Sequence, residues 1–125
     1  MTARLVRVAL AAVLMLLSAR VSVAEAHAVL VKSSPARRAT LAISPSRVEL
    51  TFNERLEPAY STLSVWADQV RVDDGKIVVG PEDPRKLSVG VPPLKKGGYS
   101  VKYRVLSVDG HLVEGTFPFD VRPRP

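Results

Sequence analysis

Apolar and polar residues alternate in short segments along the chain after residue 27. Residues 47–52 place Val48, Leu50 and Phe52 on one side and polar neighbours on the other, as expected of a strand with one buried face. The same period of two recurs at 87–91, 99–105 and 117–121, and further strand candidates are 28–32, 61–66, 70–72 and 76–79. No segment has a convincing amphipathic-helix pattern, so the chain is expected to be all-β.

Turn-forming residues separate these segments. Pairs such as Ser34-Pro35, Asp74-Gly75, Pro92-Pro93 and Gly97-Gly98 fall between the strand candidates. Seven or eight short strands in one domain predict a small antiparallel sandwich or barrel. The length of 125 residues is that of a single domain, and no internal repeat is evident.

The first 26 residues have a different character. Arg4 and Arg7 precede an apolar run of ten residues, 8–17, and a small-x-small site follows at 24–26. This is the pattern of a cleaved secretory signal peptide. The run is about half of the roughly 20 residues that a membrane helix needs, so a permanent anchor is the weaker interpretation. Cleavage after Ala26 predicts a mature domain of residues 27–125 in the periplasm or outside the cell.

Composition changes once the predicted signal peptide is set aside. Three of the 18 basic and one of the 12 acidic residues lie in it, which leaves 99 residues with 15 basic and 11 acidic side chains, a net charge of +4. The basic residues are scattered and match no nucleic-acid-binding motif, so a nucleic-acid partner is not expected. Both methionines also lie in the signal peptide, and the chain has no cysteine. The mature domain therefore offers no sulfur ligand, which excludes a soft Cu(I) site and cysteine chemistry.

Only two histidines are present, and both lie where they could bind metal. His27 is the predicted first mature residue, so its free α-amine and its imidazole can chelate one ion together. His111 follows Asp109-Gly110 between the two strongest strand candidates. Three nitrogen donors and one carboxylate suit tetragonal Cu(II), although Zn(II) or Ni(II) can use similar donors. An Asp-Gly hairpin turn followed by a solvated histidine is the structural alternative.

Four segments carry a resemblance to a known family. The sequences HAVLVKSSP at 27–35, VELTFNE at 48–54, GYSVKYRVLSVDGH at 98–111 and GTFPFDV at 115–121 closely resemble the CopC family of periplasmic copper-resistance proteins. The resemblance spans essentially all of residues 27–125. It implies an immunoglobulin-like β-sandwich of Greek-key type that binds copper and is not an enzyme.

The resemblance also implies a ligand set and a partner. The family's Cu(II) ligands fall on His27, Asp109 and His111, with one ion per chain, and an acidic position near the copper falls on Glu54. Some members have a methionine-rich loop for Cu(I), but the corresponding stretch 67–86 has no methionine, which indicates a Cu(II)-only member. The family also suggests transfer of copper to a CopD-type permease of the inner membrane.

Two other functions are compatible with parts of the sequence. Lytic polysaccharide monooxygenases also bind copper through an N-terminal histidine and a second imidazole. Five of the seven mature aromatics lie on predicted buried rows, however, and only Tyr60 and Trp66 remain for a sugar-binding surface. A metal-free sandwich acting as an envelope module explains the strands equally well but leaves the two histidines without a role.

Overall fold

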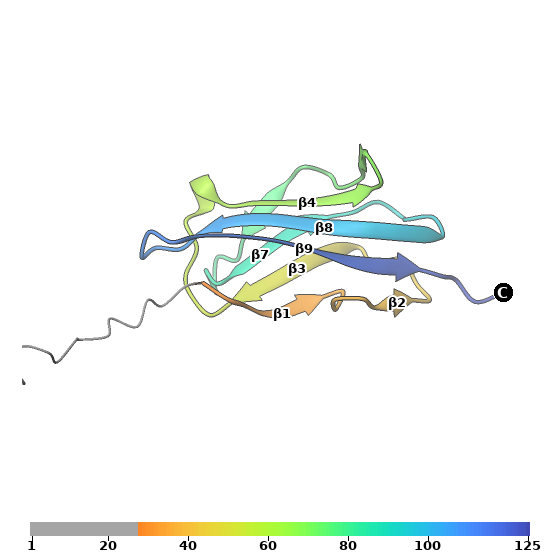
Figure 1. Cartoon of the computed structure of the whole chain (residues 1–125), viewed down its shortest axis with the longest axis horizontal. Helices are drawn as coiled ribbons and strands as arrows, with labels where there is room; N and C mark the ends of the chain where they lie inside the picture. Colours follow the sequence, from red (N-terminus) through yellow and green to blue (C-terminus); the bar gives the residue numbers. More distant parts are fainter. Residues whose placement is uncertain (1–27) are drawn as a thin grey trace, which may run out of the picture.

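The computed structural model describes residues 28–125, which form two β-sheets packed face to face (Figure 1). The signal peptide predicted at residues 1–26 and the predicted ligand His27 lie outside the described residues.

The nine described strands divide four and five between the sheets. The first sheet has, in spatial order, β1 (Leu30–Ser34), β3 (Arg47–Phe52), β7 (Lys86–Gly90) and β6 (Ile77–Val79). The second has β2 (Thr40–Leu41), β9 (Leu112–Val121), β8 (Gly97–Leu106), β4 (Thr62–Ala67) and β5 (Val70–Arg71). The chain crosses repeatedly between the sheets, and the predicted class of a small immunoglobulin-like β-sandwich is confirmed.

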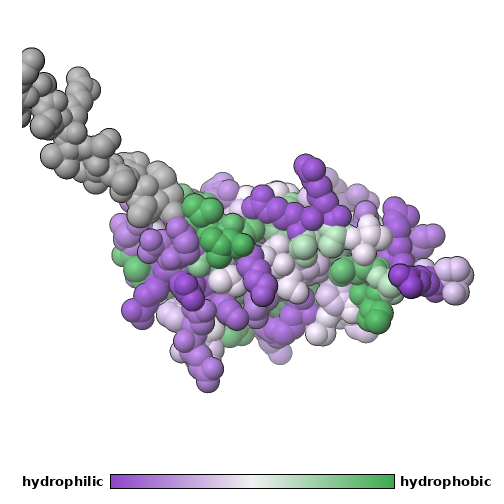
Figure 2. Space-filling view, turned by 90° about the horizontal axis from the view of Figure 1, so that it is seen from below, coloured by the Kyte–Doolittle hydropathy of each residue, from purple (hydrophilic) through white to green (hydrophobic). Residues whose placement is uncertain are grey.

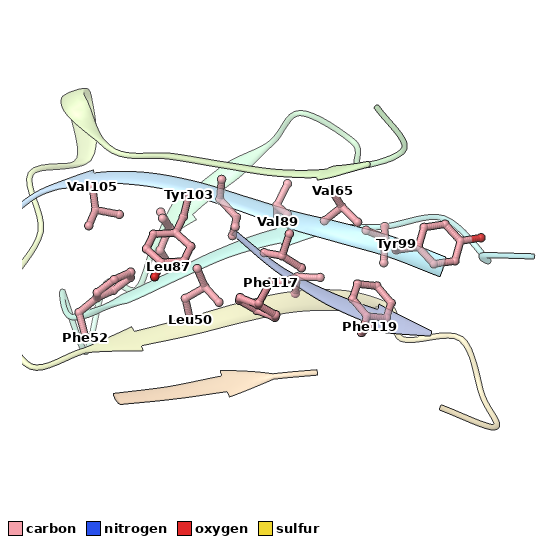
Figure 3. Packing of buried hydrophobic residues seen from close by; sticks show 14 of the residues in the cluster. Leu50, Phe52, Val65, Leu87, Val89, Tyr99, Tyr103, Val105, Phe117 and Phe119 are labelled. Carbon is pink, nitrogen blue, oxygen red and sulfur yellow. The ribbon is translucent and has the colours of Figure 1, made fainter. Parts of the chain in front are cut away.

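The predicted apolar rows fill the space between the two sheets (Figure 3). All five aromatic residues that the alternation assigns to buried rows are at most 8% exposed: Phe52, Tyr99, Tyr103, Phe117 and Phe119. The Tyr99 and Phe119 rings stack with centroids 5.4 Å apart, and Phe52 meets Tyr103 edge-on at 5.6 Å. Each fully buried large side chain contributes roughly 1.5–3 kcal/mol relative to an exposed one, so these rows stabilise the sandwich.

The structure contains two short elements that the sequence analysis did not predict. Strand β2 was not predicted, and it pairs in parallel with β9, whereas the other pairs are antiparallel. A strand of two residues carries no readable period, and its pairing partner is about 80 residues away in sequence. A short 3-10 helix, η1 (Pro58–Tyr60), lies in the connection between β3 and β4 and has proline in its first turn.

The Asp73 side chain connects β4 to the loop that follows β5 through hydrogen bonds. Its side chain is fully buried and accepts hydrogen bonds from the Val65 amide at 2.8 Å, the Gly75 amide at 2.9 Å and Arg71 Nε at 2.8 Å. Burial alone raises the pKa of this carboxyl, but the bonds from Arg71, Val65 and Gly75 outweigh burial and lower it. A lowered folded-state pKa means that ionised Asp73 stabilises the fold above about pH 4, and that this stability is lost as the pH falls further.

We expect Asp73→Ala to lower the free energy of unfolding by about 2 kcal/mol at neutral pH, because the Val65 amide loses its partner inside the sandwich. Urea denaturation measures the change. Asp83→Ala is the matched control, because that carboxylate pairs with Arg85 in an exposed loop and should leave the midpoint nearly unchanged. Equal effects of the two substitutions would contradict the role assigned to Asp73.

Candidate metal centre

The loop between β8 and β9 comprises residues 107–111 and is closed by its own backbone. The Ser107 amide donates to the His111 carbonyl at 3.0 Å, and the Gly110 amide donates to the Ser107 carbonyl at 2.9 Å. Gly110 has φ of +91°, a conformation that residues with a side chain rarely adopt. The loop is thus a defined turn whose geometry depends on glycine between Asp109 and His111.

Asp109 and His111 are brought together by this turn. Asp109 Oδ2 lies 3.1 Å from His111 Nδ1, and Oδ1 accepts a bond from the His111 amide at 3.2 Å. The Ser107 hydroxyl also donates to Oδ1. The two side chains are 32% and 36% exposed, so solutes can reach them.

The carboxyl of Asp109 is strongly acidic in this setting. Hydrogen bonds from the Ser107 hydroxyl, the His111 ring and the His111 amide lower its pKa to about 2. Asp109 is therefore an anion at neutral pH and at moderately acidic pH. A permanent carboxylate beside an imidazole nitrogen is a pair of donors that a divalent cation can bind.

The start of the described chain is attached next to this loop. Val29 donates its amide to Asn53 Oδ1 at 2.6 Å and accepts a bond from the Asn53 amide at 3.0 Å. Two residues farther, the Arg55 carbonyl accepts a bond from the Val108 amide at 2.9 Å. The segment 53–55 therefore holds both the chain start and the loop, and Figure 1 shows the two at the same end of the sandwich. We call this end the loop end.

The remaining predicted site residue is Glu54, and Ala28 is the described residue that follows the predicted ligand His27. Ala28 is only 2% exposed, so the residue that directly follows His27 is packed into the protein. Glu54 lies at the loop end between Asn53 and Arg55 and is half-buried. The structure places it near the loop, but no hydrogen bond joins its carboxylate to Asp109 or His111 among residues 28–125. Nor does any group of three or more His, Asp or Glu side chains suited to a metal occur in those residues.

Two residues that shape the site were given no role by the sequence analysis. Ser107 is 1% exposed and orients Asp109, and Asn53 fixes the chain start. A serine two residues before an aspartate in a turn is a recognisable capping signal. The role of Asn53 depends on a contact across 24 residues, for which the sequence carries no local signal.

The described residues contain no helix long and apolar enough to span a membrane. The model of the CopC domain family matches residues 30–122. Copper transport protein CutJ of Bacillus subtilis is 34% identical over 98 residues, which are 77% of this chain but only 18% of CutJ.

Two solved structures share the fold and part of the sequence. The CopC structure from Methylosinus trichosporium OB3b has a TM-score of 0.68 and 40% identity, covering 79% of this chain and 97% of that one. PcoC, a methionine-rich copper resistance protein from Escherichia coli, has a TM-score of 0.66 and 28% identity, covering 78% and 100%. Family model, relatives and fold agree: this chain belongs to the CopC family of copper-resistance and copper-transport proteins, which are not enzymes.

Proposed function

We propose that this protein captures Cu(II) outside the cytoplasm and holds one ion per chain. The proposed ligands are the α-amine and imidazole of His27, the imidazole of His111 and the carboxylate of Asp109. The observation that carries the proposal is the Asp109–His111 pair, formed in a defined turn and attached to the same segment as the chain start.

The spacing of the pair suits neighbouring ligands of one ion. Metal bonds to imidazole and carboxylate measure about 2.0–2.2 Å, so two donors at right angles lie roughly 3 Å apart. Asp109 Oδ2 and His111 Nδ1 are 3.1 Å apart. Asp109 Oδ2 and His111 Nδ1 would hold the ion together, and the hydrogen bond from the Ser107 hydroxyl would keep the carboxylate in place through Oδ1.

The donor set favours Cu(II) over other copper states and metals. Three nitrogens and one oxygen suit tetragonal Cu(II), which also has the highest affinity of the common divalent first-row ions for such donors. The mature domain has no sulfur, in contrast to PcoC, whose structure is described as methionine-rich. A Cu(I) site is therefore not part of the proposal.

The proposed site requires export of the protein, because the His27 α-amine becomes free only when the signal peptide is removed. Cleavage after Ala26, in the periplasm or outside the cell, releases the α-amine of His27. Ala28 and Val29 are held beside the loop, so a terminus one residue earlier begins close to Asp109 and His111. Transfer to a CopD-type membrane permease is a compatible next step, because CutJ contains a segment similar to this chain within a much longer transport protein.

The alternative of a copper oxidase receives less support from the surface. Lys102 Nζ lies 4.9 Å from the centre of the Trp66 ring, and the indole donates to Ser64 Oγ at 2.8 Å. Trp66 is therefore engaged within the sheet face instead of forming an open sugar platform. Tyr60 is 68% exposed but is the only aromatic residue among the exposed large hydrophobic residues in the described part of the chain. An Asp109 ligand also fills a position that oxygen activation needs open.

Cu(II) titration followed by Trp66 fluorescence and electron paramagnetic resonance tests the proposal. We expect one tetragonal Cu(II) per chain with nitrogen hyperfine structure. Affinity should fall steeply between pH 8 and pH 5, because protons compete with Cu(II) for the α-amine and the imidazoles. Asp109 does not contribute to this loss, because its pKa of about 2 lies below the range.

Each alternative gives a different result. A metal-free envelope module shows no saturable Cu(II) binding at pH 8. A copper oxidase consumes ascorbate and oxygen when loaded with copper and oxidises a polysaccharide. An affinity unchanged between pH 8 and pH 5 would show that the amine and imidazoles are not the ligands.

A further inference from the structure

The end of the sandwich opposite the loop end is formed by three segments in contact. The Leu94 amide donates to Ser44 Oγ at 2.7 Å, which joins the β2–β3 and β7–β8 connections. The Arg122 amide donates to the Leu41 carbonyl at 2.8 Å, which attaches the tail after β9 to β2. Figure 1 shows the C-terminus and the start of β8 at this end. We call it the basic end, for the residues described next.

Exposed apolar residues form the tip of the basic end. Ile43 is 83% exposed, the highest value among the large hydrophobic residues that the structure describes as exposed. Pro92 and Pro93 of the connection that contacts Ser44 are exposed as well. In Figure 2 hydrophobic atoms lie beside hydrophilic side chains at the end farthest from the grey segment. An isoleucine this exposed gains stability only when another apolar phase covers it.

Four cations flank this apolar tip. Lys95 and Lys96 follow Pro93 directly, and Arg122 and Arg124 lie in the attached tail; all four are exposed. None of the four forms an ion pair within residues 28–125. Asp120 beside Gly98 and the exposed Asp68 in the turn after β4 are carboxylates at this end, and the charges of the exposed Asp74 and Lys76 cancel. The basic end therefore carries a local excess of about two positive charges.

We propose that the basic end docks on an anionic phospholipid bilayer. Exposed Lys and Arg are each attracted to an anionic lipid surface, and an apolar side chain among them can enter the boundary between headgroups and acyl chains. The combination of Ile43 and two prolines with four unpaired cations matches both contributions. An acidic protein partner would account for the cations but not for the exposed isoleucine.

Docking in this way orients the proposed copper site. Strand β8 runs the length of the sandwich from the basic end to the loop end, and its ten residues span roughly 30 Å. Asp109 and His111 therefore face away from the lipid, where they meet Cu(II) from the surrounding solution. The inference is independent of copper binding, since none of the residues of the basic end belongs to the proposed ligand set.

Vesicle flotation of the exported protein tests the inference. We expect binding to vesicles rich in phosphatidylglycerol at low salt, little binding to pure phosphatidylcholine, and release in 1 M salt, where the Debye length is about 3 Å. Replacing the four cations by glutamine should weaken binding by about 600-fold, at about fivefold per cation. Ile43→Ser should weaken it by about tenfold further.

The control is a second variant in which four other cations are replaced by glutamine, at Lys32, Arg37, Arg38 and Arg55. It has the same net charge as the first variant. Its binding should stay within about threefold of the parent protein, whereas an equal loss in both variants would reduce the effect to net charge and overturn the inference. Equal binding to neutral vesicles, or no binding to anionic vesicles at low salt, would overturn it as well. Binding only to acidic polypeptides would reassign the surface to a protein partner. Circular dichroism of both variants checks that the fold is intact.

Discussion

One residue added in front of His27 is expected to weaken Cu(II) binding by about 10²–10⁴-fold. The imidazole remains in such a variant, but the His27 nitrogen becomes a peptide nitrogen, and the new α-amine lies outside the five atoms that close the chelate with Nδ1. Two donors on one residue raise each other's effective concentration, and this gain is what the extension removes. Competition with a chromophoric Cu(II) chelator at pH 8 measures the affinity, and electron paramagnetic resonance reports the donor set.

Substitutions in the loop test the other ligands against a matched neighbour. His111→Ala should remove one nitrogen from the spectrum. Asp109→Asn can still accept the bond from Ser107 but has no charge, so it should weaken binding while the turn persists. Val108→Ala, an exposed position in the same loop, should leave the affinity unchanged. A terminal extension that binds Cu(II) as tightly as the parent would show that the amine is not a ligand.

Gly115→Ala is expected to destabilise the sandwich by about 3 kcal/mol, the largest effect on folding that we foresee for a single methyl group. Gly115 lies opposite Tyr103 in the β8–β9 pair. An added Cβ would stand 2.7 Å from Tyr103 Cε1 and closer still to the phenol oxygen. The ring cannot retreat, because it is nearly buried and packs edge-on against Phe52. Thermal and urea denaturation of the copper-free protein measure the change.

A second substitution separates this collision from a general intolerance of β9. Tyr103→Leu removes the ring, so Gly115→Ala should destabilise that background far less than it destabilises the parent. Gly98→Ala is the control on β8, since its Cβ meets only the Asp120 carboxylate oxygen at 3.1 Å, which can rotate away. Additive effects of Gly115→Ala and Tyr103→Leu would mean that the ring is not the cause.

The strands with a clear period of two could be predicted from sequence because their two faces meet different environments. The row Val48, Leu50 and Phe52 is fully buried, and β3 has the predicted bounds. Strand β9 begins five residues before the predicted Phe117, at Leu112, because Gly115 interrupts the apolar row where Tyr103 takes up the space. The parallel pairing of β2 could not be predicted, since it depends on tertiary contacts of two residues.

The candidate site divides in the same way between local and distant contacts. Asp109 and His111 are two residues apart, so their proximity follows from the turn that Gly110 permits. The attachment of the chain start through Asn53 links residues 24 apart, and no periodicity encodes it. Copper coordination by His27 remains a proposal that the titration and the terminal extension test.

The attachment of Val29 to Asn53 also has a consequence for the order in which an exported chain becomes competent. The predicted amine is at the start of the mature protein, yet the loop that carries the other proposed donors lies within the last twenty residues. Strands β8 and β9 pair locally, but the chain start must wait for both before the proposed donors can meet. If His27 ligates copper as proposed, copper uptake by the exported protein would report completed folding, and a chain midway through export would not retain the metal.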